Sequence, residues 1–334
     1  MNNHHTGITM VVDGKRCLLG VITDGDARRA IMAGTDMAVT AQSLLDNKNE
    51  QAQPVVAPAA TKRSELVELF KKARVQYIPL LNEFQQVVDL VSVNEVLANE
   101  ESSVQAVVFA GGRGIRLLPL TERLPKPMLR VGDRPLMEVM IGQLSQAGIR
   151  QITIATHYLG EEIIKYFGDG HKYGVELNYL KEDHPLGTAG ALGLLEAPQK
   201  SLLVINGDIL TNVDFRAMLA YHKEHAAALT VAVRKYDLSI PYGVVETEGI
   251  FVRSLTEKPA LSLFANAGIY LLEPLVHKYI PTDQRFDMTD LIQRLLDADI
   301  PVVSFPVVEY WLDIGLQADY LQAQEDMKNG RIKT

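Results

Sequence analysis

From residue 104 onward, short apolar runs alternate with amphipathic segments, and this alternation limits the folds that the chain can adopt. Apolar runs of strand length occupy residues 105–110, 151–155, 176–180 and 201–205. Segments of helical period lie between them, at residues 136–147 and 160–167. Strands and helices that alternate in this way build a sheet with helices on both faces. The sequence therefore predicts a doubly wound, mostly parallel, Rossmann-like α/β domain over residues 104–330, with ligand chemistry at the carboxyl ends of its strands.

A glycine-rich turn follows the first of these runs. Residues 110–121 read AGGRGIRLLPLT, and residues 124–127 read LPKP. Glycine lets backbone amides approach phosphate oxygens closely, because no β-carbon stands in the way. The turn is not the Gly-x-Gly-x-x-Gly of dinucleotide-binding folds, and it lacks the Gly-Lys-Ser/Thr ending of a P-loop. Its distinguishing features are Arg116, two residues past the last glycine, and Lys126, which lies between two prolines.

In these residues the chain resembles the sugar-1-phosphate nucleotidyltransferase family, whose signature is Gly-Gly-x-Gly-x-Arg-Leu-x-Pro-Leu-Thr followed by Pro-Lys-Pro. The resemblance extends from residue 104 to about residue 325 and implies transfer of a nucleotidyl group from an NTP to a sugar 1-phosphate. It implies catalytic roles for Arg116 and Lys126. One departure is Ile115, where the family usually carries Thr. The implied nucleotide-binding residues of the turn are Ala110, Gly111, Gly112 and Gly114.

The reaction that the resemblance implies requires charge neutralisation above all. A sugar phosphate attacks the α-phosphorus of the NTP, and both reactants are anions, so positioning and neutralisation must carry the catalysis. Arg116 presents a fixed fork of donors that suits the triphosphate and the leaving pyrophosphate. Lys126 supplies a point charge near the α-phosphate. No side-chain nucleophile is needed, because the sugar phosphate is already ionised at neutral pH.

Two acidic residues are candidate Mg²⁺ ligands. Asp208 follows the apolar run at residues 202–205, and Asp313 lies in the sequence WLDIG. Neither residue alone would indicate a metal site, because an Asp at the end of a strand often caps a helix. The resemblance implies that both bind Mg²⁺, which would bridge phosphate oxygens and use only a couple of carboxylates.

Residues 182–190, EDHPLGTAG, resemble the family's base-recognition loop. The resemblance implies nucleotide contacts from Glu182, Gly187 and Thr188. Relatives that use UTP or dTTP tend to carry Gln where this chain has Glu182. A carboxylate only accepts hydrogen bonds, which suits the two adjacent N–H donors of guanine and opposes the carbonyls of uracil and thymine. We therefore expect GTP as substrate, with UTP and dTTP as alternatives; in a further alternative, Glu182 points to solvent and the backbone reads the base.

Residues 1–100 form a second, smaller α/β region. Strand pairs at residues 8–12 with 18–22 and at 77–81 with 87–91 are each followed by a helix, which indicates a repeat about 70 residues long. Each copy ends in a polar motif, GVITDGD or DLVSVNE. These motifs resemble a cystathionine-β-synthase (CBS) domain pair, which implies that an adenine nucleotide contacts Thr23, Asp26 and Ser92. The second copy departs from the CBS pattern at Asp89 and Glu95. The first copy lacks the helix that the CBS pattern has before its strands. Residues 100–103 are expected to connect the two regions.

Three further segments resemble the sugar-binding side of the family, at residues 241–245, 257–259 and 266–270. The combination with CBS repeats resembles guanylyltransferases that activate glucosamine 1-phosphate for nonulosonic acid synthesis. Mannose 1-phosphate and heptose 1-phosphate remain open, because one or two contacts decide between epimers. The implied sugar-phosphate ligands are Gly243, Glu257, Lys258 and Asn266.

The composition of the chain limits the classes of partner that it can bind. The 334 residues carry a net charge of −8 without a basic block, which argues against a nucleic acid partner. Cys17 is the only cysteine, so no internal disulfide forms, and no apolar run reaches membrane-spanning length. We expect a cytoplasmic homo-oligomer without a membrane partner. The competing interpretation is a non-catalytic regulatory protein that senses nucleotide, and Ile115 is its only support.

Overall fold

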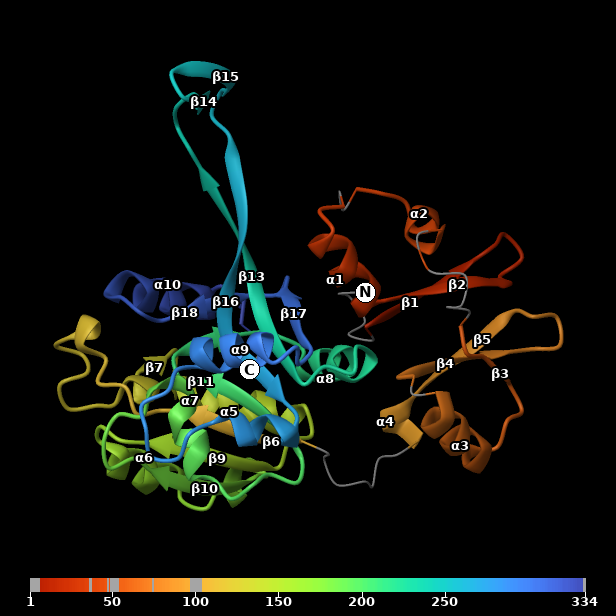
Figure 1. Cartoon of the computed structure of the whole chain (residues 1–334). Coiled ribbons are helices and arrows are strands. Elements are labelled where there is room, and N and C mark those ends of the chain that lie inside the picture. The colour runs from red at the N-terminus through yellow and green to blue at the C-terminus, as the bar shows by residue number, and fades with distance from the viewer. Residues whose placement is uncertain are drawn as a thin grey trace. The chain divides into compact units, whose positions relative to one another are not determined.

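The computed structural model describes residues 7–35, 38–46, 48, 54–73, 75–96 and 104–332. The expected connector at residues 100–103 lies outside the described residues. The chain divides into two compact units (Figure 1). One comprises residues 1–102 and 215–226, and the other comprises residues 103–214 and 227–334. Within the described residues, none of the helices is both long and apolar enough to cross a bilayer.

A seven-stranded sheet in the order β10-β9-β6-β11-β16-β13-β17 forms the centre of the second unit. Only β16 runs antiparallel to its neighbours, β11 and β13, and the remaining pairings are parallel. The predicted mostly parallel α/β sheet is therefore confirmed. Its strands are β6 (Val104–Phe109), β9 (Gln151–Thr156), β10 (Glu176–Lys181), β11 (Ser201–Asn206), β13 (Leu229–Ser239), β16 (Ala260–Leu272) and β17 (Val302–Val307).

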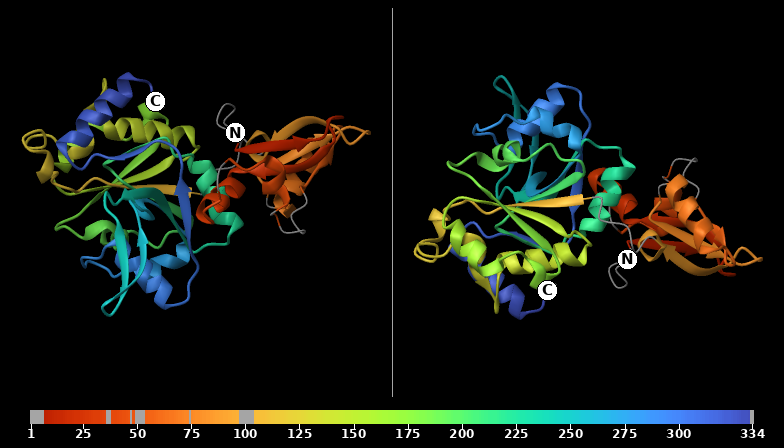
Figure 2. Two further views of the ribbon diagram at one scale, coloured as in Figure 1. Left: turned by 90° about the horizontal axis from the view of Figure 1, so that it is seen from above. Right: turned by 90° about the horizontal axis from the view of Figure 1, so that it is seen from below.

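Helices cover both faces of this sheet, and α5 and α9 lie on opposite faces (Figure 2). Central strands are apolar nearly throughout because both of their faces are buried. Val108 on β6, Ile154 on β9 and Val204 on β11 have exposed fractions of 0%. The helices of this unit are α5 (Leu136–Gln146), α6 (Gly160–Phe167), α7 (Gly187–Gly190), α9 (Met288–Asp297) and α10 (Gln317–Lys328), with the 3-10 helices η1 (Ile115–Leu117), η2 (Lys126–Met128), η3 (His171–Tyr173), η4 (Ala191–Leu194) and η5 (Pro274–Tyr279).

Two strands continue beyond the sheet as a long antiparallel ribbon, the arm, which comprises residues 234–265 (Figure 1). Pairing between β13 and β16 runs without interruption from Val233 opposite Asn266 to Ser239 opposite Ala260. A hairpin of β14 (Val244–Glu248) and β15 (Phe251–Thr256) ends the arm. The remaining short strands are β7 (Arg130–Val131), β8 (Arg134–Pro135), β12 (Ile209–Thr211) and β18 (Trp311–Asp313).

The first unit contains two hairpins that share one turn geometry. Asp13 Oδ1 accepts hydrogen bonds from the N–H groups two and four residues later, at 2.8 Å each. Asn82 Oδ1 does the same at 3.0 and 2.9 Å. Arg16 and Gln85 then take the left-handed backbone conformation, with φ of 67° and 61°. A hairpin followed by a helix therefore occurs twice, as the sequence predicts, whereas the CBS assignment stays a prediction.

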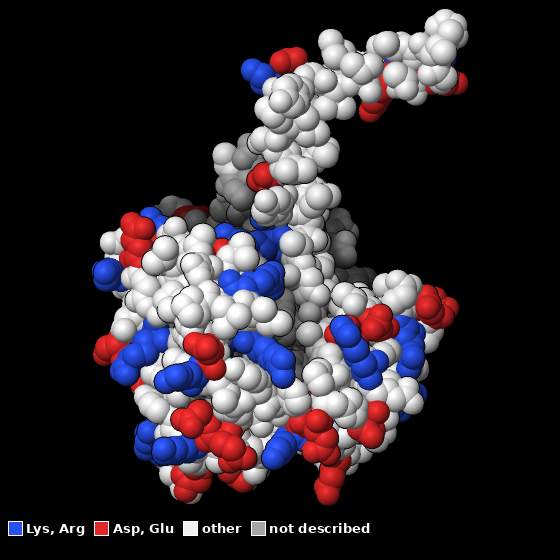
Figure 3. All heavy atoms as spheres, turned by 90° about the vertical axis from the view of Figure 1, so that its left-hand side faces the viewer, with Lys and Arg blue, Asp and Glu red and all other residues white. Residues whose placement is uncertain are grey.

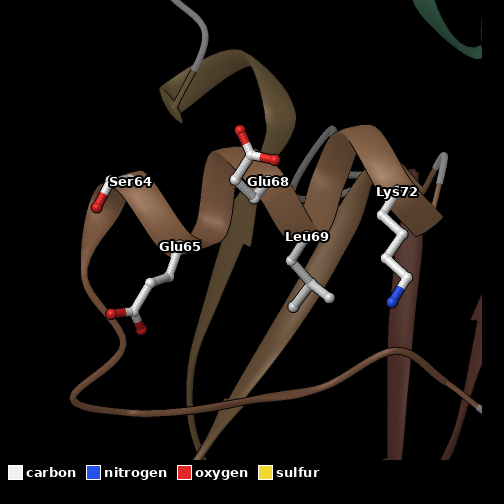
Figure 4. Close-up of a pocket in the computed structure, with 5 residues that line it drawn as sticks. All are labelled: Ser64, Glu65, Glu68, Leu69 and Lys72. Atoms are coloured by element: carbon white, nitrogen blue, oxygen red, sulfur yellow. The ribbon is translucent and has the colours of Figure 1, made fainter.

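The first unit consists of the two hairpins, a further short strand and the helices beside them. A pocket in the unit is lined by one face of α3 alone, by Ser64, Glu65, Glu68, Leu69 and Lys72 (Figure 4). The elements are β1 (Ile8–Val12), β2 (Leu18–Thr23), α1 (Asp24–Met32), α2 (Ala41–Asp46), β3 (Ala57–Pro58), α3 (Arg63–Ala73), β4 (Tyr77–Leu81), β5 (Val87–Ser92), α4 (Val93–Val96) and α8 (Phe215–Glu224).

Candidate functional site

A buried lysine lies between two carboxylates at the carboxyl end of the central sheet. Lys126, in η2, has an exposed fraction of 8%. Its Nζ is 2.5 Å from Asp208 Oδ2 and 3.9 Å from Asp313 Oδ1. Asp208 follows β11, and the antiparallel pairing of β12 with β18 places Asp313 opposite Ile209. This pairing brings the two carboxylates together although they are far apart in the sequence.

Lys126, Asp208 and Asp313 together form the centre of the site, and the electrostatics of this centre favour an additional cation. Asp208 Oδ1 and Asn206 Oδ1 are buried and have no hydrogen-bond partner among the described residues. Burial raises the pKa of Asp313, the charge of Asp208 raises it further, and Lys126 opposes both effects. A buried carboxylate oxygen without a donor is costly unless a cation contacts it. Among the described residues, no three acidic, histidine or cysteine side chains are grouped to hold a metal. A metal ion bound at this centre would therefore take most of its ligands from water or substrate.

The glycine-rich turn is held beside this lysine by Thr121. Gly114 has a φ of 61°, and a Cβ there would lie 2.9 Å from Thr121 Cγ2 and 3.3 Å from Lys126 Cβ. The Thr121 hydroxyl donates to the Gly114 carbonyl at 2.8 Å. Arg116 lies in η1, and its Nη2 is 3.8 Å from the position that a Cβ on Gly315 would take, two residues after Asp313. Arg116, Lys126, Asp208 and Asp313 are thus gathered at one place.

Ile115 is exposed at the glycine-rich turn, where its exposed fraction is 67%. The apolar replacement of the family's usual Thr therefore lies largely in solvent.

Glu182 faces the glycine-rich turn, so the alternative that it points to solvent is wrong. Its exposed fraction is 6%. Oε2 accepts the N–H of Leu186 at 3.1 Å. Oε1 lies 3.1 Å from the position that a Cβ on Gly111 would take. Burial raises the pKa of Glu182, and the Leu186 N–H partly opposes this rise. One oxygen of Glu182 therefore holds the loop at residues 182–190, and the other lies against the glycine-rich turn.

Asp287, which the sequence analysis missed, organises the loop after Glu182. Gly187 has a φ of 81°, and a Cβ there would lie 2.5 Å from Asp287 Oδ1. The Thr188 N–H donates to the same oxygen at 2.9 Å, and the Thr188 hydroxyl accepts the N–H of Met288 at 2.9 Å. These bonds tie Thr188 to the start of α9. A signal was present, because Asp287 and Asp290 have the spacing of a capping box.

The predicted sugar-phosphate residues fall into two places. Asn266 lies at the root of the arm, where its Oδ1 accepts the N–H of Gly268 at 3.0 Å. Gly268 in turn faces Asn206, since a Cβ on it would lie 2.7 Å from Asn206 Nδ2. Asn206, with its unpartnered oxygen, is a second residue that sequence reasoning missed.

Gly243, Glu257 and Lys258 lie together near the outer end of the arm. Glu257 Oε2 is 3.0 Å from the position that a Cβ on Gly243 would take. The N–H of Lys258 donates to the carbonyl of Tyr242 at 3.2 Å. Figure 1 shows the hairpin of β14 and β15, which ends the arm, well away from the helices and the other strands of the seven-stranded sheet. The structure therefore brings these three residues to one another but not to the centre.

In the first unit, the predicted ribose contacts bind one another. Thr23 caps α1: its hydroxyl accepts the N–H of Asp26 at 3.2 Å and donates to Asp26 Oδ2 at 2.9 Å. The Asp26 carboxylate also pairs with Lys48 and Arg29, at 2.5 Å each. Burial alone would raise the pKa of Asp26, but the hydrogen bonds from Lys48 and Thr23 lower it overall. Ser92 is half-buried at the end of β5.

Known proteins are similar in sequence to the second unit. A sequence model of a family described as "Nucleotidyl transferase" matches residues 105–330. A UTP–glucose-1-phosphate uridylyltransferase from a Synechocystis species is 34% identical over 69% of this chain and 65% of its own length. A mannose-1-phosphate guanylyltransferase from Mycobacterium tuberculosis is 30% identical over 68% of this chain and 65% of its own. The chain thus spans about 65% of the length of these curated relatives.

Solved structures show the same fold. A putative glucose-1-phosphate thymidylyltransferase from Bacillus anthracis aligns with a TM-score of 0.54 at 26% identity, over 66% of this chain and 94% of that one. HddC from Yersinia pseudotuberculosis, in complex with GMP-PN, aligns with a TM-score of 0.52 at 25% identity, over 67% of this chain and 99% of that one. The four names cover guanylyl, uridylyl and thymidylyl transfer or a guanine nucleotide ligand, so they leave the base open.

Proposed function

The chain belongs to the nucleotidyl transferase family, and we propose that it joins an NTP to a sugar 1-phosphate. An oxygen of the sugar phosphate forms a bond to the α-phosphorus of the NTP. The bond from the α-phosphorus to the bridging oxygen breaks, and that oxygen leaves with the pyrophosphate. The observation that carries this proposal is Lys126, a buried cation held between Asp208 and Asp313 beside a glycine-rich turn.

We propose that Asp208 and Asp313 hold Mg²⁺. The unpartnered buried Oδ1 of Asp208 and the raised pKa of Asp313 fit a divalent cation that prefers carboxylate oxygens. When bound, Mg²⁺ supplies positive charge at the phosphate oxygens. The chain's own contribution is to hold Lys126 and Arg116 on the same side of the glycine-rich turn, where they bind phosphates and orient the α-phosphorus for attack.

We propose GTP as the preferred nucleotide, with UTP and dTTP as the alternatives. Glu182 is buried against Gly111, and its Oε1 is directed at the turn rather than at solvent. A carboxylate there accepts a guanine N–H and repels a uracil or thymine carbonyl. The GMP-PN in the HddC structure agrees with this choice, whereas the Synechocystis relative is named for UTP.

The base proposal is tested by Glu182→Gln, with Glu176→Gln as the matched control. Gln keeps an oxygen for the Leu186 N–H and adds a donor, so the loop stays folded while the charge disappears. Glu176 is an exposed residue on β10. We expect the ratio of kcat/KM for GTP to that for UTP to fall at least about tenfold in Glu182→Gln, which corresponds to about 1.4 kcal/mol. An unchanged ratio in both variants contradicts the proposal.

For the sugar we propose an amino-sugar phosphate, glucosamine 1-phosphate, with mannose 1-phosphate and heptose 1-phosphate as alternatives. This proposal rests on the resemblance of the two-region organisation to guanylyltransferases of nonulosonic acid synthesis. Pyrophosphate release from GTP and Mg²⁺ with each of the three sugar phosphates separates them. Equal turnover with mannose 1-phosphate and glucosamine 1-phosphate contradicts the amino-sugar proposal.

We also propose that the first unit binds an adenine nucleotide at Thr23, Asp26 and Ser92. The carboxylate of Asp26 would have to exchange Lys48 or Arg29 for ribose hydroxyls, because both cations contact it now. Isothermal titration with AMP and ATP tests this proposal. Saturable binding that Asp26→Ala abolishes supports it, and equal heats for the variant and the wild type contradict it.

A further inference from the structure

The β9 segment, residues 155–158, comprises the end of β9 and the two residues after it. In the sheet, β9 lies between β6, which leads into the glycine-rich turn, and β10, which leads into the loop at residues 182–190. All three strands are parallel, so the loops that follow them meet at one edge of the sheet. The β9 segment is therefore placed to contact both loops that the proposed function assigns to the nucleotide.

Hydrogen bonds tie the β9 segment to both loops. The Tyr158 N–H donates to the Gly111 carbonyl in the glycine-rich turn at 3.4 Å. On the other side, the Glu182 N–H donates to the Thr156 carbonyl at 2.9 Å. Tyr158 also reaches the residue after the turn, where its hydroxyl donates to the Glu122 carbonyl at 3.0 Å. One short segment thus sets the position of the turn and of the first residue of the loop.

The imidazole of His157 adds a side-chain bond to Glu182. Its Nδ1 lies 3.0 Å from the Glu182 carbonyl oxygen. A carbonyl oxygen only accepts, so Nδ1 carries the proton and donates it to this bond. Glu182 is then held at three points: its N–H by Thr156, its carbonyl by His157, and its Oε2 by the N–H of Leu186. The remaining oxygen, Oε1, is thereby given a fixed direction.

His157 and Glu182 both lie against Gly111. A Cβ on Gly111 would be 3.2 Å from His157 Cβ and 3.1 Å from Glu182 Oε1. Atoms packed this closely transmit displacements, since no free space between them absorbs a shift. Loss of the Nδ1 bond would therefore let the Glu182 carboxylate move relative to the turn.

Surface charge does not distinguish one NTP from another, because all NTPs carry the same triphosphate. Lys and Arg side chains are interspersed with Asp and Glu over the face of the molecule drawn in Figure 3. Long-range electrostatic attraction steers every nucleotide equally. Selection between guanine and uracil must therefore come from polar groups held at fixed positions, and Glu182 Oε1 is such a group.

We propose that His157 is a positioning residue for base selection, which acts by donating from Nδ1 to the Glu182 carbonyl. This bond holds the Glu182 carboxylate at a fixed distance from Gly111, so that one NTP binds with its phosphates at the turn and its base at the carboxylate. The proposal rests on the proposed function, in which Glu182 selects guanine. Without the bond the carboxylate moves, and guanine loses more than uracil because guanine alone offers it two adjacent donors.

His157→Asn and His157→Gln form a matched pair for the test. Asn places an N–H at the position of Nδ1, whereas the N–H of Gln lies one bond further out, so only Asn keeps the bond to the Glu182 carbonyl. His157→Leu removes the donor, and His171→Asn is the control, because the His171 side chain is 81% exposed in η3. Isothermal titration with GTP and with UTP, each with Mg²⁺, gives the two dissociation constants for every variant.

The Leu and Gln variants are expected to bind GTP at least about fivefold more weakly, as the loss of one hydrogen bond implies, with UTP affinity within about twofold of wild type. The Asn variant and the control should stay within about twofold of wild type for both nucleotides. In turnover, the KM for GTP should rise while kcat keeps its wild-type value, because the groups at the α-phosphate are untouched. A merely structural role for His157 would weaken GTP and UTP binding alike.

Two results would overturn the proposal: an unchanged ratio of GTP to UTP affinity in the Gln variant, and an Asn variant that binds GTP no better than Gln. The comparison of Asn with Gln stands even where the Leu variant does not fold, and Trp311 emission shows whether the second unit is native. Turnover separates the proposed function from this proposal. A wild type that binds GTP but releases no pyrophosphate with any sugar 1-phosphate refutes the function alone, and the ratio of affinities still decides the role of His157.

Discussion

The loop at Gly187 offers a sharp test of how the site is built, through Gly187→Ala with Gly148→Ala as the control. Both glycines have a positive φ, of 81° and 90°. A Cβ on Gly148 would meet nothing within 4 Å, whereas a Cβ on Gly187 would lie 2.5 Å from Asp287 Oδ1 and 2.8 Å from the Phe286 carbonyl. The two substitutions therefore share backbone strain and differ in the collision.

The expected magnitudes follow from these contacts. The left-handed conformation costs an alanine about 1–2 kcal/mol, so Gly148→Ala should lose about that much. Overpacking against backbone adds about 1–3 kcal/mol, so Gly187→Ala should lose about 2–5 kcal/mol of unfolding free energy. The loop is also expected to move, which would displace Glu182 and Thr188 and raise the KM for the NTP at least about tenfold.

Trp311 makes the assay specific. It is the only tryptophan and lies on β18, so its fluorescence in urea reports the unfolding of the second unit. Pyrophosphate release measured against NTP concentration gives the KM. Equal losses of stability in the two variants, or an unchanged KM in Gly187→Ala, would refute the idea that the Asp287 contact shapes the nucleotide loop.

Three more substitutions test separate parts of the account. Lys126→Met should lower kcat about 10²–10³-fold with secondary structure retained by circular dichroism, and near-normal pyrophosphate release would contradict its role at the α-phosphate. Thr121→Val removes one of two hydrogen bonds to the Gly114 carbonyl, which keeps the one from the Leu117 N–H, and should cost about 0.5–1.5 kcal/mol in urea unfolding; no loss would be contrary to expectation. Asp26→Asn should destabilise the first unit at pH 7, because the Asp26 pKa is lowered in the fold. That stabilisation is lost as pH falls through the folded pKa, so the gap between variant and wild type should close below about pH 4, and a gap independent of pH would refute the pairing with Lys48.

Local patterns predicted several strands and helices of both units well. The strand at Ile8–Val12, the strand at Tyr77–Leu81 and the helix at Gly160–Phe167 have the predicted bounds. Each has a clear period bounded by turn residues, so neighbours in sequence decide its conformation. The mostly parallel order follows from the alternation of such segments.

The arm could not be predicted in the same way. Its strands alternate like ordinary sheet strands, and nothing within a few residues of Leu238 or Leu261 indicates that β13 and β16 continue past the sheet. The pairing is set by contacts between distant segments. The resemblance to a family named Gly243, Glu257 and Lys258 as sugar ligands, but their distance from the centre depends on the course of the arm.

The site contains residues that the sequence predicted and residues that it did not. Asp208 and Asp313 were identified by motif, and the β12–β18 pairing supplies the physical reason that they meet. Asp287 carries only the spacing of a helix capping box, and Asn206 carries no motif of its own. Asp287 acts through a helix cap onto Gly187, and Asn206 is distinguished by a buried unpartnered oxygen, which only three-dimensional packing reveals.

The most direct test of the proposed reaction is pyrophosphate release by the wild-type protein with Mg²⁺. GTP, UTP and dTTP are each combined with glucosamine 1-phosphate, mannose 1-phosphate and heptose 1-phosphate. Turnover that requires both a sugar 1-phosphate and Mg²⁺, and that is fastest with GTP, is the predicted result. Absence of pyrophosphate in all nine combinations, with nucleotide still bound, would contradict the assignment of Lys126, Asp208 and Asp313 to nucleotidyl transfer.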